Sequence, residues 1–99
     1  MSVDVDRLRE VIRDLHGVEV THVRSENARE TFRGKVAWEH TVEVFEVSGD
    51  ARARFAYAWS FKNDAGNREY VAVLGVPPVN SALDAVRASI AAEQKARAK

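Results

Sequence analysis

The chain of 99 residues contains no cysteine, only two prolines and no apolar run as long as a membrane span. Without cysteine it forms no disulfide, has no thiolate nucleophile and builds no cysteine-based zinc site. A transmembrane helix needs about 20 consecutive apolar residues, and the N-terminal sequence "MSVDVDRLRE" has no apolar core of a signal peptide. We therefore expect a cytoplasmic protein without a membrane partner, which folds through packing alone.

The chain also has no net charge, because 15 Lys and Arg residues balance 15 Asp and Glu residues. Nucleic-acid-binding domains usually carry a basic face, so this balance disfavours nucleic acid as a partner. The sequence has no phosphate-binding glycine loop, no Ser-His-Asp set and no recognised spacing of metal ligands. We therefore predict no cofactor and no metal, and we lean toward a protein without catalytic activity.

Hydrophobic periodicity divides the chain into two helices with strands between them. Apolar residues at three- and four-residue steps predict a helix in residues 2–16, which Gly17 ends. Ser81 and Asp84 have the spacing of a capping box and begin a second helix. Between the helices the period changes to two, which is typical of strands. The four strands expected there are Val18–Phe32, Lys35–Val47, Arg52–Lys62 and Glu69–Val76.

This order predicts one α+β domain over residues 1–99, with the plan α-β-β-β-β-α. Short turns connect the strands, so we expect a four-stranded antiparallel meander. The polar first strand is expected at an edge, with a bulge near residues 25–28. Both helices are expected to pack on one face of the sheet. Their covering residues would be Leu8, Ile12, Leu15, Leu83, Val86 and Ile90.

The segment "ARFAYAWSFK" places four aromatic residues on one side of the third strand: Phe55, Tyr57, Trp59 and Phe61. If residues 49–50 form a two-residue hairpin turn, Val44 lies opposite Phe55. A shift of one residue would place Glu39 and Glu43 against the aromatic side and leave their charges without partners. We therefore interpret the aromatic side as core rather than as a platform on which ligand rings stack.

His40 and Tyr57 are the polar groups on this aromatic side, and they are the candidate catalytic residues. A histidine inside an apolar pocket with a nearby phenol can act in acid-base catalysis near neutral pH. The alternative is that the two groups hydrogen-bond each other or the backbone. A pocket between sheet and helices would take a small apolar ligand and would be lined by Trp38, His40, Tyr57 and Trp59.

The opposite side of the sheet also collects apolar residues beside the small residues Ala56 and Ala58. Such a patch can accept a second copy of the chain. We predict a homodimer through the sheet, with the interface residues Phe45, Tyr70, Leu74 and Val76.

His22 lies near Glu26 and Glu30 on the first strand, which is one conceivable set of metal ligands. Their spacing matches no recognised ligand motif, however. Alternating charges on an edge strand also discourage aggregation between edges. We interpret this stretch as a solvated edge.

The order of elements is similar to two known plans: double-stranded-RNA-binding domains, and the cystatin or nuclear-transport-factor type with a long meander around a helix. The RNA-binding plan implies a lysine cluster at the start of its last helix, but "PPVNSALDAVR" offers only Arg87. The residues identify no family. Our leading hypothesis is a cytosolic domain that self-associates or binds another protein through its sheet. The alternatives are a small-molecule binder or acid-base enzyme, and an RNA-binding domain.

Overall fold

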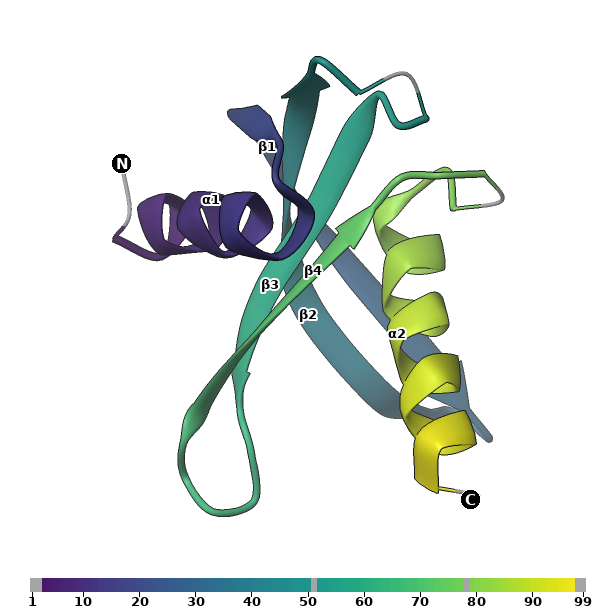
Figure 1. The fold of residues 1–99 in the computed structure, drawn as a ribbon. Coiled ribbons are helices and arrows are strands. Elements are labelled where there is room, and N and C mark those ends of the chain that lie inside the picture. The colour runs from purple at the N-terminus through teal and green to yellow at the C-terminus, as the bar shows by residue number, and fades with distance from the viewer. Residues whose placement is uncertain (1–2, 51, 78, 98–99) are drawn as a thin grey trace.

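Two helices and a four-stranded sheet form the computed structural model, which describes residues 3–50, 52–77 and 79–97 (Figure 1). The elements are α1 Val3–His16, β1 Glu19–Phe32, β2 Lys35–Ser48, β3 Phe55–Lys62, β4 Arg68–Leu74 and α2 Ala82–Arg97. The strands are antiparallel in the order β1-β2-β3-β4, and both helices contact the sheet. The predicted fold class and element order are therefore confirmed. Within the described residues, no helix is long and apolar enough to cross a membrane.

The register between β2 and β3 differs by two residues from the predicted one. Val44 lies opposite Tyr57 rather than Phe55, because β2 ends at Ser48 and β3 begins only at Phe55, which is farther along the chain than a two-residue turn allows. Asp50 organises the connecting loop by accepting hydrogen bonds from the guanidinium group and the backbone N–H of Arg52. These bonds lower the pKa of Asp50 to about 2. A shift of two residues keeps every side chain on its predicted face.

The helices pack against opposite faces of the sheet, which corrects the prediction of one shared face. The α1 cluster contains Val5, Leu8, Ile12, Val18, Val20, Phe45, Ala56 and Ala58. The α2 cluster contains Ala28, Val42, Val44, Tyr57, Trp59, Ala82, Ala85 and Val86. Adjacent strand residues such as Val44 and Phe45 point to opposite faces, and Figure 1 shows the helices on either side of β4. Each face needs a cover because both faces are apolar.

A bulge allows β1 to contribute to both clusters. Val20 lies opposite Val47 on the α1 side, whereas Ala28 lies opposite His40 on the α2 side. The register shifts between residues 22 and 24, so the even-numbered residues change faces there. The bulge therefore lies a few residues earlier than the predicted position at 25–28.

Among the predicted cover residues, Leu15 and Leu83 are not buried. Leu15 is 63% exposed, while Leu8 and Ile12 are buried as expected. In α2 the small residues Ala82 and Ala85 are buried instead of Leu83. These small side chains share a buried cluster with Tyr57 and Trp59 of β3.

Candidate binding site between the two hairpins

The sheet opens between β2 and β3. Their ladder ends where Glu43 lies opposite Ala58, although β2 stays paired with β1 as far as Lys35. Likewise β3 stays paired with β4 as far as Lys62. Figure 1 shows the two hairpins diverging beyond the shared ladder, with the β1-β2 hairpin passing behind α2. In the described part of the chain, two strand edges thus face each other without pairing.

One hydrogen bond identifies the backbone groups that point into this opening. Val47 N–H donates to Arg54 O at 2.9 Å, and alternate residues of a strand direct their N–H and C=O groups to the same side. The backbone N–H and C=O groups of odd-numbered β2 residues therefore point toward β3, and those of Thr41 are among them. The backbone N–H and C=O groups of even-numbered β3 residues point toward β2, and those of Ser60 are among them. The backbone of both residues is directed into the opening.

A hollow of about 390 Å³ occupies the opening. Its lining comes from α1 and from three of the strands: Leu8, Glu39, His40, Thr41, Glu43, Ser60, Phe61 and Arg68. Residues from both faces of β2 contribute, because the strands separate here and expose the edge between the faces. The hollow therefore combines charged groups, hydroxyl groups and aromatic rings.

Side chains of β1 hold two carboxylates on the β2 wall of the hollow. Glu43 Oε1 accepts hydrogen bonds from His22 Nε2 at 2.8 Å and from Ser25 Oγ at 2.5 Å, and the Glu43 side chain is only 13% exposed. Glu39 Oε2 accepts a hydrogen bond from Asn27 Nδ2 at 2.7 Å. These bonds fix both carboxylates beside the opening.

A guanidinium group lies on the opposite wall. Arg68 Nη1 donates a hydrogen bond to Ser60 Oγ at 3.1 Å. Because a hydroxyl is neutral, this bond orients the arginine without cancelling its charge. The two walls thus differ in sign, with two carboxylates facing one guanidinium group.

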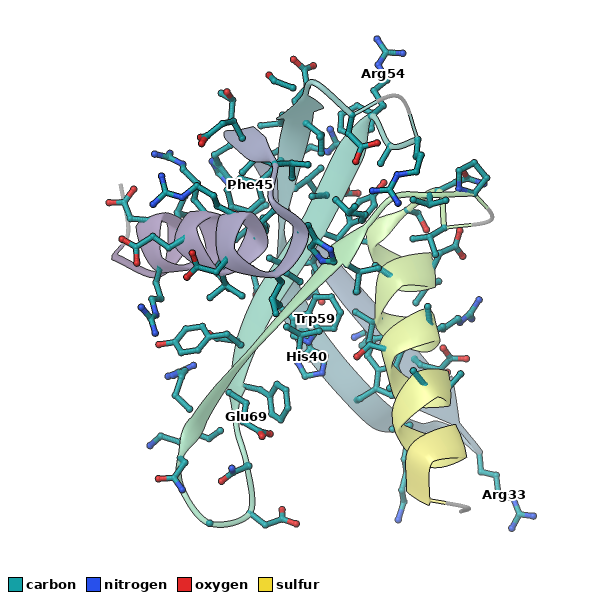
Figure 2. All side chains as sticks on the ribbon, viewed as in Figure 1. Arg33, His40, Phe45, Arg54, Trp59 and Glu69 are labelled. Atoms are coloured by element: carbon teal, nitrogen blue, oxygen red, sulfur yellow. The ribbon has the colours of Figure 1, made fainter. Side chains whose placement is uncertain are left out.

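Aromatic rings close the opening on the α2 side. The His40 ring stacks between Trp38 and Trp59, with centroid distances of 5.9 Å to each. The Phe61 ring lies 5.6 Å from it. Figure 2 shows His40 and Trp59 together between the diverging strands. Burial among these rings lowers the pKa of His40 from its ordinary value of 6.5, which favours the neutral imidazole.

The predicted acid-base pair is not brought together. The ring contacts of His40 are with Trp38, Trp59 and Phe61, not with Tyr57. Tyr57 is 3% exposed, and burial, helped by the nearby charge of Glu26, raises the pKa of its phenol. Its core position agrees with the interpretation of the aromatic side as core.

The four predicted pocket residues do not share one cavity in the described structure. His40 lines the hollow between the hairpins, Trp38 borders a second hollow near α2, and Tyr57 borders a third near residues 75–80. Trp59 is 2% exposed. Of the four, His40 alone is placed where a ligand in the hairpin opening would touch it.

The predicted dimer surface is largely covered, which corrects its interpretation as a free face. Phe45 is fully buried and lies beside α1 in Figure 2. Tyr70 and Leu74 pack against the same α1 cluster, and the guanidinium group of Arg7 lies 5.3 Å from the Tyr70 ring centroid. Val76 is 37% exposed, but it follows β4 rather than forming part of it.

The considered metal ligands are separated. Their partners form three different pairs: His22 with Glu43, Arg24 with Glu26, and Arg87 with Glu30. Among the described residues, no cluster of three or more His, Asp or Glu side chains is suited to a metal ion.

Sequence reasoning missed the hollow, although it placed Glu39 and Glu43 correctly on the face of the sheet opposite the aromatic residues. Period-two alternation assigns a residue to a face, but it does not reveal where two strands stop pairing. Comparisons with family models, with curated proteins and with solved structures found no match to the chain.

Proposed function

We propose that the protein is a small binding domain without catalytic activity, which takes an extended segment of a partner protein into the opening between β2 and β3. The observation that carries this proposal is the end of the β2-β3 ladder at Glu43 and Ala58. An unpaired strand edge can bind an added strand through main-chain hydrogen bonds. The opening offers two such edges, so an inserted segment would pair on both sides.

The polar groups around the opening favour binding over catalysis. Hydrogen bonds from β1 orient each carboxylate on the β2 wall, and an oriented carboxylate can hold a ligand in place. Among the described residues, the His40 ring packs against the rings of Trp38, Trp59 and Phe61 rather than against a proton donor or acceptor. Fixed carboxylates, a fixed guanidinium group and open backbone edges are the elements of a recognition site.

Self-association is the second candidate, and the outer edge of β4 supports it. Gly75 N–H donates to Phe55 O at 2.7 Å. The backbone N–H and C=O groups of odd-numbered β4 residues therefore point toward β3, and those of even-numbered residues point away from the sheet at its outer edge. Three residues have backbone groups that point outward: Tyr70, Ala72 and Leu74. They belong to an apolar edge strand, and such a strand tends to pair with another strand. The expected homodimer would then form at this edge and not through the covered face. We also propose that the protein is cytoplasmic, as the sequence predicts.

Selection of random nine-residue peptides on phage against the immobilised protein tests the first candidate. We expect peptides to be enriched, and we expect Thr41→Pro to bind them at least about fivefold more weakly, because proline removes the N–H that points into the opening. Thr41→Ala is the matched control, since it shortens the side chain but keeps the N–H.

Two results would contradict this proposal: no enrichment of any peptide, or equal affinity of the enriched peptides for wild type and Thr41→Pro. The RNA-binding alternative predicts a different behaviour, namely affinity for RNA that falls steeply as salt is raised.

A further inference from the structure

The two sides of the opening differ in chemistry, and this difference constrains the sequence of the segment that would bind there. The inference rests on the proposed function. Side chains of a strand alternate between its two faces. A segment between β2 and β3 would present every second side chain to the hollow beneath Leu8 and the others to the rings around His40. The segment therefore needs two kinds of side chain in alternation.

The ring side leaves room only for small side chains. The His40 ring on β2 lies 5.9 Å from the Trp59 ring and 5.6 Å from the Phe61 ring on β3. These contacts bridge the two hairpins beneath the opening. A large side chain of the bound segment would have to separate them and disturb a packed cluster, which typically costs about 1–3 kcal/mol.

The polar side favours a positive charge. Glu39 and Glu43 lie on the β2 wall, while Arg68 lies on the opposite wall, so the groups facing the hollow carry an excess of negative charge. Both hydrogen bonds to Glu43 end on Oε1, and the bond from Asn27 to Glu39 ends on Oε2. In the described structure, each carboxylate thus keeps a second oxygen for a further donor.

We propose that the bound segment carries a lysine or arginine that faces Glu39 and Glu43, with a small residue on each side of it facing the rings. The cationic group donates hydrogen bonds to the two carboxylates. Meanwhile the backbone of the segment pairs with Thr41 on one strand and with Ser60 on the other. An acidic residue at the same position is rejected, because two carboxylates repel it while one guanidinium group attracts it.

Synthetic peptides that differ at one position test this inference. The probe is acetyl-TATAKATAT-amide, in which alanines face the rings and lysine faces the carboxylates. Two partner peptides replace the lysine with glutamine or glutamate, and a third replaces both alanines beside the lysine with leucine. Binding is followed through the fluorescence of the two tryptophans. We expect the lysine peptide to bind about tenfold more tightly than the glutamine peptide, and the glutamate and leucine peptides to bind more weakly still.

Glu39→Lys provides the charge-reversed protein. We expect it to prefer the glutamate peptide over the lysine peptide, while Glu46→Lys, the same change at an exposed β2 position outside the hollow, keeps the wild-type order. If the lysine, glutamine and glutamate peptides bind the wild-type protein equally well, the charge inference is overturned. The proposed function still stands in that case if Thr41→Pro loses the binding of all three peptides. If no peptide binds to the wild-type protein, both are overturned.

Discussion

His40 belongs both to the packed aromatic cluster and to the hollow between the hairpins. Its imidazole stacks against Trp38 and Trp59, and it lines the hollow. Burial lowers its pKa from the ordinary value of 6.5, so the folded state binds this proton less tightly than the unfolded chain does. Acidification therefore acts against folding at this residue, beginning near pH 6.5 and continuing downward to the lowered pKa.

His40→Phe is expected to weaken the dependence of stability on pH. Phenylalanine keeps a ring in the stack but has no proton to bind, so the variant should lose less unfolding free energy than wild type between about pH 7.5 and pH 5.5. Urea unfolding at the two pH values measures this difference. An equal loss in the two proteins would show that His40 is not held in its neutral form by burial.

Among the elements, β4 has an outer edge that α1 partly guards. His16 Nε2 lies 3.1 Å from Ala72 O, and Ala72 is one of the residues whose backbone points away from β3. The end of α1 therefore occupies an acceptor that a second strand would need. A second strand that pairs with the outer edge of β4 must therefore displace His16 from Ala72 O.

His16→Ala should uncover the edge. We expect the variant to lose about 1 kcal/mol of unfolding free energy, the usual contribution of one hydrogen bond, and to show a larger weight-average mass than wild type at high concentration. Light scattering after size-exclusion chromatography measures the mass. His16→Gln, which keeps a side-chain donor, is the control. If the alanine variant stays at the wild-type mass at every concentration, His16 does not guard the edge.

The sequence predicts a structural feature well when neighbouring residues in the chain determine that feature. The spacing of Ser81 and Asp84 predicts a helix start, and Gly17 is predicted to end the first helix. Both are confirmed, because Asp84 N–H donates to Ser81 Oγ at 3.1 Å and Gly17 has a positive φ. The loop at residues 49–54 is different, because the bonds between Asp50 and Arg52 compete with a tighter turn that the Gly-Asp pair also suits. Local pattern does not decide between them.

The site was less predictable than the fold for the same reason. His22 and Ser25 meet Glu43 across two strands, and only the register after the β1 bulge decides this. Residue types indicated a bulge in β1 but placed it a few residues too late, and they gave no signal for the point where β2 and β3 separate. The sequence pattern therefore located the aromatic core and missed the hollow beside it.

At the scale of the whole molecule, both faces of the sheet are covered by helices, and the exposed backbone lies at strand edges. The outer edge of β4 is partly guarded by His16, and β1 carries alternating charges that discourage pairing. The opening between β2 and β3 is instead lined by oriented polar groups. This contrast is why we place partner binding inside the sheet rather than at its outer edges.

Amide hydrogen exchange, followed by NMR at Thr41 and Ser60, tests this account most directly. In the free protein we predict fast exchange at both amides and slow exchange at Phe45 and Ala56, which lie opposite each other within the ladder. Adding the lysine peptide should slow exchange at Thr41 and Ser60. Slow exchange at these two amides without any peptide would mean that the strands pair with each other and that the opening does not exist.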